Sequence, residues 1–248
     1  MEAVWQWFAW LYDETGVNLT VFYDSYDRGR MLRGFLTTIW LSLVCILFSI
    51  AIGIVGAWLQ GSNLRFIRSV VQGYIQLFRN TPPLVQLYFF FFGLGSIVPR
   101  VDDGFGGLEP MFGGFFWAVV SLSFFAGAFN VEIFRAGIEA VPKATREAAE
   151  SLGYSRLQAY VHVILPLALR VSLPALNNNL VNLVKTTTLA FAIAVPEMLY
   201  VASQIWSDEL NVPEMMTFLL FAYVFLVGVL VWAMHRWERA MRVPGYGA

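Results

Sequence analysis

Residues 34–58 of the chain read GFLTTIWLSLVCILFSIAIGIVGAW, and no acidic or basic side chain interrupts this stretch. Roughly 20 predominantly apolar residues are enough for a helix to cross the hydrocarbon core of a bilayer. The composition agrees, because 58% of the 248 residues are hydrophobic and only 13% are charged, against about 25% charged in an average soluble domain. The stretch is therefore predicted to be a transmembrane helix of an integral membrane protein.

Further apolar stretches complete a predicted all-α membrane domain of five transmembrane helices, and they lie at residues 70–97, 113–134, 173–203 and 215–237. Pro82 and Pro83 fall inside the second span and Pro196 inside the fourth. Proline lacks the backbone donor that a helix interior needs, and neighbouring groups must satisfy the carbonyls that it frees. We therefore expect these two helices to kink or to break at their prolines.

The orientation in the membrane follows from Lys and Arg, which concentrate in cytoplasmic loops. Here they gather after the first span, after the third span and in the tail: Arg65, Arg68, Lys143, Arg146, Arg156, Arg170, Arg236, Arg239 and Arg242. The loop after the second span instead carries Arg100 with Asp102, Asp103 and Glu109, and the loop before the fifth span carries Asp208, Glu209 and Glu214 without Lys or Arg. This asymmetry predicts an N-terminus outside and a cytoplasmic tail at 238–248. Arg28, Arg30 and Arg33, before the first span, conflict with it.

The N-terminal segment at 1–33 precedes the membrane domain, which is predicted to cover 34–237. Its first part mixes aromatic with acidic side chains: Trp5, Trp7, Phe8, Trp10, Tyr12, Asp13 and Glu14. Aromatic rings favour the boundary between lipid and water, and amphipathic segments lie flat there. We expect an interfacial segment rather than a further span.

The segment at 139–166, between the third and fourth spans, contains the sequence VPKATREAAESLGYSRLQAYVHVILP from position 141 onward. Strong helix formers fill residues 144–152, and Pro142 suits a first helical turn. Gly153 is placed to end that helix in a left-handed cap, and Ser155 with Gln158 forms a capping-box pattern for a second helix. A short helix held in this way can dock into a groove on a partner protein.

These residues carry a family resemblance. The triplet EAA at 147–149, Gly153, and Leu-Pro at 165–166 resemble the EAA loop of ABC importer permeases. Val163 departs mildly from the isoleucine of that pattern. An isolated triplet would be weak evidence, but correctly spaced glycine and Leu-Pro between membrane spans make the signal specific.

Three other stretches are similar to the polar amino acid branch of that family: FRNTPPLVQL at 78–87, NVEIFRAG at 130–137 and RVPGY at 242–246. The resemblance implies a type I importer fold with five spans and a cytoplasmic coupling helix. It also implies a polar amino acid as cargo. The residues that it assigns to coupling with the ATPase are Ala144, Glu147, Ala148, Ala149, Leu152 and Gly153.

The resemblance implies partners as well. A second permease subunit, identical or related, two ATP-binding subunits and an extracytoplasmic solute-binding protein would complete a complex in the bacterial inner membrane. ATP and Mg would bind to the ATP-binding subunits, since this chain has no GxxxxGK[ST] phosphate loop. The chain itself is expected to bind no cofactor and to catalyse no reaction.

Polar side chains inside the spans are costly and often face a water-filled cavity. Asn178, Asn182 and Lys185 are spaced i, i+4 and i+7, which places them on one helical face. The other candidates for the substrate pathway are Gln86, Asn130, Glu132, Thr186 and Thr187. Lys185 suits a substrate carboxylate and Glu132 its ammonium group. A donor-rich surface of this kind, with Lys185 and the adjoining threonines, favours a cargo with an acidic or amide side chain, of the glutamate, aspartate or glutamine type.

Each of these candidates has a structural alternative. Asn178 and Asn182 are equally suited to hydrogen bonds between helices. Glu132 and Arg135, spaced i and i+3, are equally suited to an ion pair along one helix. Arg79 is expected near a membrane edge, where its side chain reaches toward the interface, and Glu197 is expected to face the outer vestibule.

Several classes of function are disfavoured. The net charge of −1 offers no broad basic surface for nucleic acid, and the single cysteine, Cys45, excludes an internal disulfide framework and a cysteine-based zinc site. No HExxH or G-x-S-x-G motif supports an intramembrane enzyme. A proton-coupled secondary transporter and a structural membrane subunit remain as alternatives, although no clear repeat of the kind found in secondary transporters is present.

Overall fold

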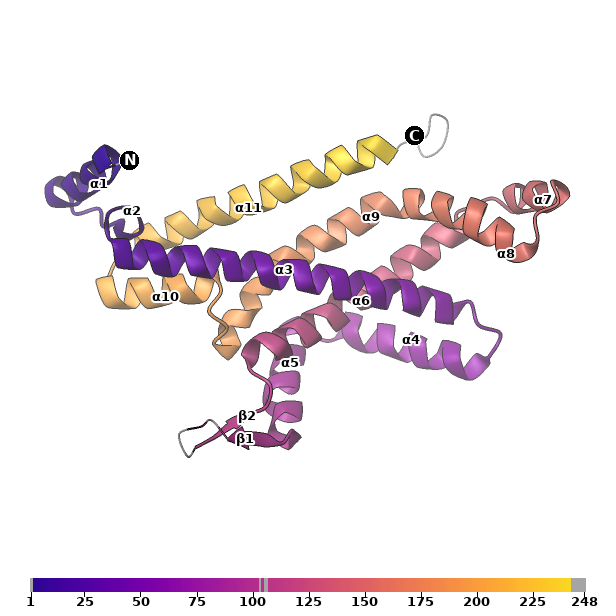
Figure 1. The fold of residues 1–248 in the computed structure, drawn as a ribbon, viewed down its shortest axis with the longest axis horizontal. Coiled ribbons are helices and arrows are strands. Elements are labelled where there is room, and N and C mark those ends of the chain that lie inside the picture. Colours follow the sequence, from indigo (N-terminus) through magenta and orange to yellow (C-terminus); the bar gives the residue numbers. More distant parts are fainter. Residues whose placement is uncertain (1, 103, 105–106, 242–248) are drawn as a thin grey trace. The chain divides into compact units, whose positions relative to one another are not determined.

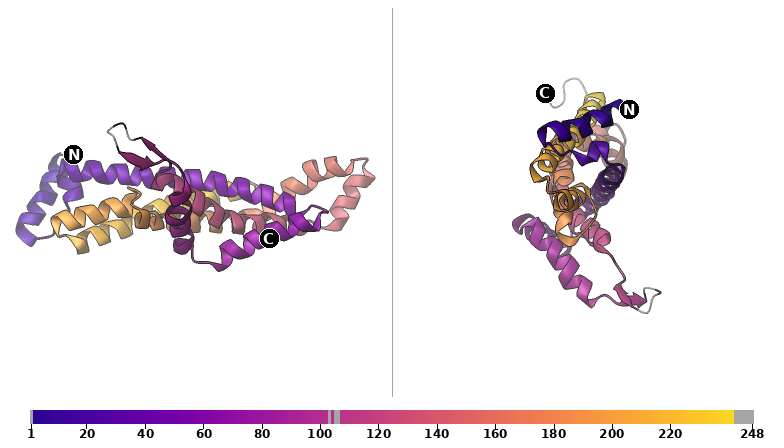
Figure 2. Two further views of the ribbon diagram at one scale, coloured as in Figure 1. Left: turned by 90° about the horizontal axis from the view of Figure 1, so that it is seen from below. Right: turned by 90° about the vertical axis from the view of Figure 1, so that its left-hand side faces the viewer.

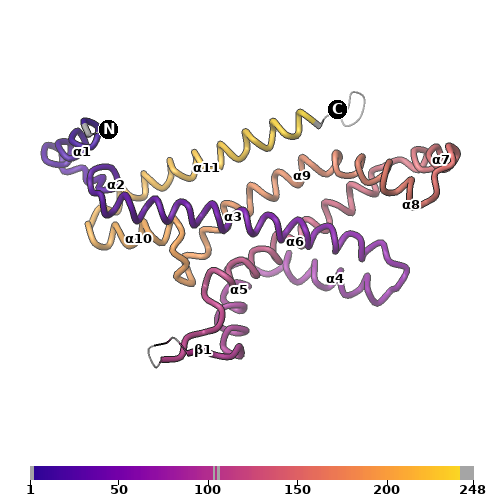
Figure 3. Tube along the Cα trace, in the orientation of Figure 1, coloured from indigo at the N-terminus to yellow at the C-terminus, as the bar shows by residue number. Residues whose placement is uncertain are grey.

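The computed structural model describes residues 2–102, 104 and 107–241 of the chain. Asp103 and the motif at 242–246 lie outside the described residues. The secondary structure is almost entirely helical (Figures 1 and 3). The elements are α1 (Glu2–Thr15), α2 (Thr20–Tyr23), α3 (Ser25–Gln60), α4 (Arg65–Asn80), α5 (Pro83–Tyr88), η1 (Phe89–Leu94), η2 (Gly95–Ile97), β1 (Arg100–Asp102), β2 (Leu108–Pro110), α6 (Gly114–Glu139), α7 (Lys143–Ser151), α8 (Arg156–Ala159), η3 (Tyr160–Ile164), α9 (Leu165–Thr186), η4 (Thr187–Ile193), α10 (Met198–Glu209) and α11 (Val212–Met241).

Within the described residues, four helices are long and apolar enough to cross a membrane: Ser25–Gln60, Gly114–Glu139, Arg156–Ile193 and Val212–Ala240. The remaining predicted span, 70–97, is interrupted. Its first part belongs to α4, which ends before Pro82, and a new helix begins at Pro83. The expected break at these prolines is confirmed, and the span is not one continuous helix.

The fourth span was predicted at 173–203, and the helix found there differs from these bounds at both ends. The helix already begins at Arg156, and it ends at Ile193. Ala194 then adopts a left-handed conformation (φ 57°), and α10 starts after Pro196. The predicted interruption at Pro196 is therefore confirmed, but it closes the span ten residues earlier than hydropathy suggested.

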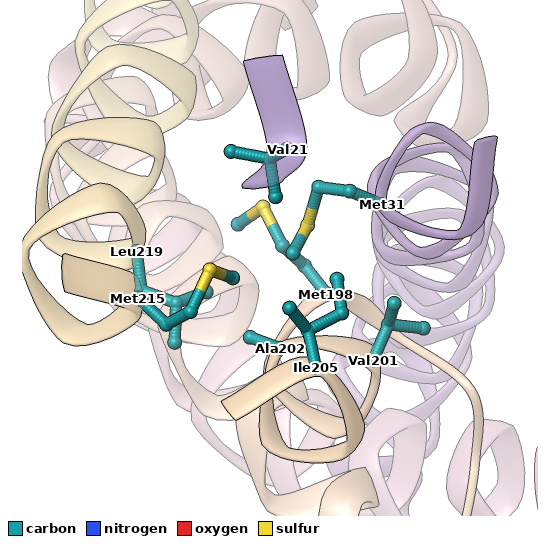
Figure 4. Packing of buried hydrophobic residues seen from close by; sticks show 8 residues of the cluster. All are labelled: Val21, Met31, Met198, Val201, Ala202, Ile205, Met215 and Leu219. Atoms are coloured by element: carbon teal, nitrogen blue, oxygen red, sulfur yellow. The ribbon is translucent and has the colours of Figure 1, made fainter. Parts of the chain in front are cut away.

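The chain divides into two compact units. The first unit combines Met1–Val44, Leu87–Val120 and Val184–Gly228. Its core is formed by Val21, Met31, Met198, Val201, Ala202, Ile205, Met215 and Leu219 (Figure 4). These side chains come from α2, α3, α10 and α11, and the antiparallel pair β1–β2, in which Val101 lies opposite Glu109, belongs to the same unit.

Glu197 is the buried polar centre of the first unit. Its carboxylate accepts hydrogen bonds from the backbone N–H groups of Leu199 (2.9 Å) and Tyr200 (2.8 Å), so that it caps α10. The Tyr223 hydroxyl donates a third bond at 3.0 Å. Glu197 is fully buried, and the expectation that it faces an outer vestibule is wrong because its oxygens bind the helix terminus instead.

The N-terminal residues fold onto the first unit. Phe8 of α1 stacks on Phe22 with ring centroids 4.3 Å apart, and the Arg28 guanidinium lies 4.0 Å from the centre of the Trp5 ring. Burial, with nearby Tyr12 and acidic groups, raises the pKa of Tyr23 to about 12, so its hydroxyl remains a donor to Asn18. The helical, aromatic character of this segment fits the expectation, and its position at the membrane interface stays a prediction.

Arg30 accounts for part of the charge that conflicted with the predicted orientation. It forms ion pairs with Asp27 (2.6 Å) and Asp208 (2.8 Å), both in the first unit. Residues 25–33 belong to α3, which begins at Ser25. Arg28 and Arg30 thus have structural partners, which explains their presence independently of loop orientation.

The second unit combines Cys45–Gln86, Ser121–Leu183 and Val229–Ala248. Ala57, Phe134, Leu176 and Leu180 form one buried cluster, and Val71, Ile75 and Val131 form another. Helices α6 and α9 approach closely at Gly137, where a Cβ atom would collide with Ser172 and lie 2.7 Å from the Ala168 carbonyl oxygen. Glycine at this position lets α6 and α9 pack in contact.

Candidate functional site

The segment between α6 and α9 has the local structure that its sequence predicts. Helix α7 begins after Pro142, and Gly153 has a φ of 90°, which is the expected left-handed conformation. The capping box is also present, since Ser155 N–H donates to Gln158 Oε1 (2.9 Å) and Gln158 N–H to Ser155 Oγ (3.4 Å). The turn from α7 into α8 is visible in Figure 1 and in salmon in Figure 2.

Most side chains of this segment are exposed. Of the six residues predicted to couple to an ATPase, Ala149 alone is buried, and α7 packs against α8 and η3. Leu152 and Leu157 are 80% and 72% exposed. The predicted coupling residues thus present an accessible surface of small, acidic and apolar side chains: Ala144, Glu147, Ala148, Leu152 and Gly153.

The segment is joined to α9 without a break. Between α8 and α9, η3 is a π-helical stretch that ends just before Leu165-Pro166. A proline ring conflicts with the carbonyl four residues earlier, and a π-helical turn is one way to accommodate an irregular hydrogen-bond ladder. Helices α8, η3 and α9 therefore form one continuous rod, which can transmit a displacement of the exposed segment.

Helix α9 carries the predicted stripe of Asn178, Asn182 and Lys185. All three side chains are exposed, whereas Leu176, Leu180 and Leu183 of the same helix are buried. The stripe is therefore a polar, outward face of a membrane helix. Lys185 also lies in the last turn of α9, where the helix dipole favours a cation.

Other candidates turn inward. Asn130 is fully buried and accepts a hydrogen bond at 2.8 Å from Asn179, whose amide also donates to the Ala126 carbonyl. Thr187 is fully buried and donates to the Val184 carbonyl at 2.7 Å, and Thr186 is half-buried. Asn130 thus links α6 to α9 by a hydrogen bond between helices, which was the structural alternative to a place in the substrate pathway.

Gln86 is buried at the break between α4 and α5. Its amide nitrogen donates to the Phe78 carbonyl (2.9 Å), the Thr81 carbonyl (3.0 Å) and the Thr81 hydroxyl (2.7 Å). The carbonyls at the end of α4 lack partners within the helix, because the following prolines cannot continue it. Gln86 satisfies them and so stabilises the break.

A polar basin of about 720 Å³ was not foreseen from the sequence. It lies within the second unit and is lined by Gln60, Arg68, Ser69, Gln72, Gly73, Gln76, Arg135 and Glu139. The α4 residues at its wall recur every three or four positions, opposite the buried Val71, Ile75 and Phe78. This periodicity of polar residues could have predicted a polar face on α4. The mean hydropathy over residues 70–97 is apolar and therefore did not reveal that face.

An ion pair joins the same two helices. Arg79 of α4 donates to the Glu132 carboxylate of α6, and its guanidinium lies 5.2 Å from the centre of the Phe129 ring. Arg135 pairs with Glu139 at 2.7 Å. The suggested Glu132–Arg135 pair is therefore not formed, and Arg79 does not simply extend toward the interface, because each side chain has a different partner.

The described residues contain no group of three or more His, Cys, Asp or Glu side chains placed to hold a metal ion. Cys45 is buried. The site therefore consists of three separate features: the exposed segment around α7, the outward stripe of α9, and the polar basin with its ion pair.

The chain is similar in sequence and in structure to known transport proteins. Residues 49–243 match the family described as binding-protein-dependent transport system inner membrane component. A probable glutamine ABC transporter permease protein of Bacillus subtilis is 29% identical over 85% of this chain and 91% of its own length. A glutamate/aspartate import permease protein of Escherichia coli is 28% identical over 99% and 98%. The crystal structure of an amino acid ABC transporter with histidines superposes with a TM-score of 0.74 at 28% identity, over 86% of this chain and 94% of that one.

The role of Gln86 can be tested by exchanging its donor for an acceptor. In Gln86→Glu, a carboxylate oxygen would face three oxygen atoms, and leaving buried carbonyls without a donor costs about 1–3 kcal/mol each. We expect the thermal midpoint of the purified chain in detergent to fall by several degrees.

Gln76→Glu is the matched control. The Gln76 oxygen already accepts a hydrogen bond from Asn80 at 2.8 Å, so a carboxylate keeps that contact and the midpoint should stay within a degree or so of the unmodified value. Equal midpoints for the two variants would contradict the assignment of Gln86 to the helix break.

Proposed function

This chain belongs to the family of binding-protein-dependent transport system inner membrane components and is thus the permease subunit of an ATP-binding-cassette importer. We propose that its cargo is a polar amino acid. The permease is a membrane component and not an enzyme. Family membership does not fit the secondary-transporter and purely structural alternatives. The observation that supports the amino acid class is similarity along nearly the whole chain to permeases named for glutamine and for glutamate/aspartate.

The side chain of the cargo is proposed to be acidic or an amide. Lys185 is exposed beside the Asn178 and Asn182 stripe, and these groups supply hydrogen-bond donors for carboxylate and amide oxygens. A cation on an outward face of a membrane helix is costly against lipid and is better placed beside water or a polar cargo. The substrate pathway would therefore pass along this face of α9, near Thr186 and Thr187.

Lys185→Met tests this assignment. Loss of a charge-assisted hydrogen bond of about 1.5–3 kcal/mol should lower glutamate uptake roughly tenfold or more. Glutamine uptake should fall less, because a neutral amide depends less on the cation. Uptake is measured in proteoliposomes that contain the full complex and its solute-binding protein, with Lys185→Arg as the control that keeps the charge. Unchanged glutamate uptake by Lys185→Met, or an unmodified complex that takes up only arginine and lysine, would contradict the proposal.

The assembled importer is proposed to contain two permease subunits, identical or related. Two ATP-binding subunits would bind ATP and Mg, and a solute-binding protein would deliver the cargo from outside. The exposed surface around α7 supports the contact with the ATP-binding subunits, since Leu152 and Leu157 offer apolar anchors for a groove. Movement of α7 and α8 would reach the pathway through η3 and α9.

Gly153 is the residue on which this coupling can be tested. In the left-handed region an L-residue other than asparagine or aspartate costs about 1–2 kcal/mol, and the space around Gly153 is otherwise open. We expect Gly153→Arg to insert in the membrane but to lose the ATP-binding subunits or ATP-driven uptake.

Gly153→Asn is the matched control, because asparagine tolerates a positive φ. It should retain most of the uptake. Both variants are compared by co-purification of the ATP-binding subunits and by uptake rate. Uptake at the normal rate by Gly153→Arg would show that the segment around α7 does not couple ATP hydrolysis to transport.

The chain is proposed to lie in the bacterial cytoplasmic membrane with its N-terminus outside and its tail, residues 238–248, in the cytoplasm. The segment at 1–33 would lie outside, at the interface. The Lys and Arg distribution supports this orientation, and the structural partners of Arg28 and Arg30 remove part of the conflicting evidence.

Single cysteines test the orientation. Asp102→Cys and Arg239→Cys, each in a Cys45→Ser background, replace exposed side chains. An impermeant thiol reagent added to intact spheroplasts should label position 102, and position 239 should react only after lysis. If both positions are labelled from the same side, the proposed topology is wrong.

A further inference from the structure

We propose that the Arg79–Glu132 ion pair is a recognition element for the α-amino acid group of the cargo. The pair opens during transport, Arg79 binds the α-carboxylate and Glu132 binds the α-ammonium. This inference rests on the proposed function, since it needs an amino acid as cargo, and it adds a site and a chemical reason for the choice.

The position of the pair follows from the register of two helices. Along α4, Arg68, Gln72 and Gln76 line the polar basin, and Arg79 is the next residue on that side after Gln76. Along α6, Glu139 and Arg135 line the basin, and Glu132 is one turn further. Because Arg79 contacts Glu132, both helices continue from the basin to the ion pair, which lies at one end of the basin.

The basin is open to the surface and large enough to admit a small molecule. Its volume of about 720 Å³ falls within the roughly 300–1,000 Å³ that is usual for small-molecule sites. Most of the residues that line it carry an amide or a charged group. Such side chains are rare where a membrane protein faces lipid. Arg79 and Glu132 thus continue, about one turn further along α4 and α6, the polar side chains that line the basin.

The two ions are accessible but held in place. The side chains of Arg79 and Glu132 are 38% and 29% exposed, so neither is sealed in the core. Arg79 is positioned by the Phe129 ring, and one of its nitrogens, Nη1, contacts Glu132. A guanidinium has five N–H donors and binds a carboxylate best through two of them. Arg79 can thus accept a second carboxylate as its partner.

The charge balance explains why a zwitterion would open the pair. Separating Arg79 from Glu132 leaves two unpaired ions at a partly desolvated position, which is strongly unfavourable. The α-carboxylate and α-ammonium of an amino acid supply a partner for both ions in the same step. A molecule with only one of these charges leaves the other protein ion unpaired. The pair should therefore select α-amino acids as a class and leave their side chains to be recognised elsewhere.

The main rival explanation is that the ion pair only holds α4 against α6. The double variant Arg79→Gln/Glu132→Gln separates the two, because it removes both charges and leaves neither ion unpaired. We expect each single variant to lower the thermal midpoint of the assembled complex and the double variant to restore most of it. If the pair binds cargo, the double variant should still lose uptake about tenfold or more, since both charge-assisted contacts are gone.

Uptake of glutamate and glutamine is measured in proteoliposomes with the complete complex and its solute-binding protein. A stable double variant with uptake close to that of the unmodified complex would overturn the inference. An unmodified complex that takes up no amino acid would instead refute the proposed function itself, so the two failures are distinguishable.

A second measurement applies even if the double variant fails to assemble. The unmodified permease–ATPase complex, in nanodiscs and without solute-binding protein, is titrated with glutamate, with glutamate α-amide and with glutarate, which lacks the amino group. The inference requires that both analogues bind about tenfold or more weakly than glutamate. Equal binding of the three compounds would overturn it.

Discussion

In a lipid bilayer, every backbone N–H and C=O group of a membrane-spanning segment must find a partner within the protein. Prolines make this difficult, and the structure meets the requirement with side chains at two positions. Gln86 donates to the carbonyls of Phe78 and Thr81 at the break before Pro83. In the other unit, the Glu197 carboxylate accepts from the N–H groups that begin α10 after Pro196. Interrupted helices are possible because these side chains replace the missing helical bonds.

This constraint divides the intramembrane polar residues into two groups. Gln86, Asn130 and Glu197 point inward and bind backbone groups or other helices. Asn178 and Lys185 point outward from α9. From the sequence, members of both groups were predicted to line one substrate pathway. A polar residue in an apolar stretch gives the same sequence pattern whether it hydrogen-bonds the backbone at a helix break or faces a cavity. Only the packing direction separates them.

Local features were predicted well from the sequence, and long-range ones were not. The glycine turn at Gly153 and the capping box of Ser155 depend on residues within a few positions of one another, and both are present. The ion pair between Arg79 and Glu132 joins residues 53 positions apart, so local spacing suggested Arg135 as the partner instead. The mean hydropathy of residues 70–97 predicted a span there. Because that mean combines the polar and apolar faces of α4, it did not predict the polar basin.

The second unit connects the exposed segment around α7 to the ion pair through direct hydrogen bonds. Helix α9 continues from α8 and η3, and Ser172 on α9 donates to the Ile133 carbonyl of α6 at 3.2 Å.

Helix α6 carries Glu132 and is joined to α4 by the Tyr74 hydroxyl, which donates to the Phe124 carbonyl at 2.6 Å. A force applied at α7 thus acts on helices that are bonded to one another and packed without a side chain at Gly137. Closely packed helices move by discrete shifts rather than by gradual deformation. A shift of α9 would therefore be transmitted to α6 and, through α6, to α4, the two helices that carry the proposed recognition pair Glu132 and Arg79.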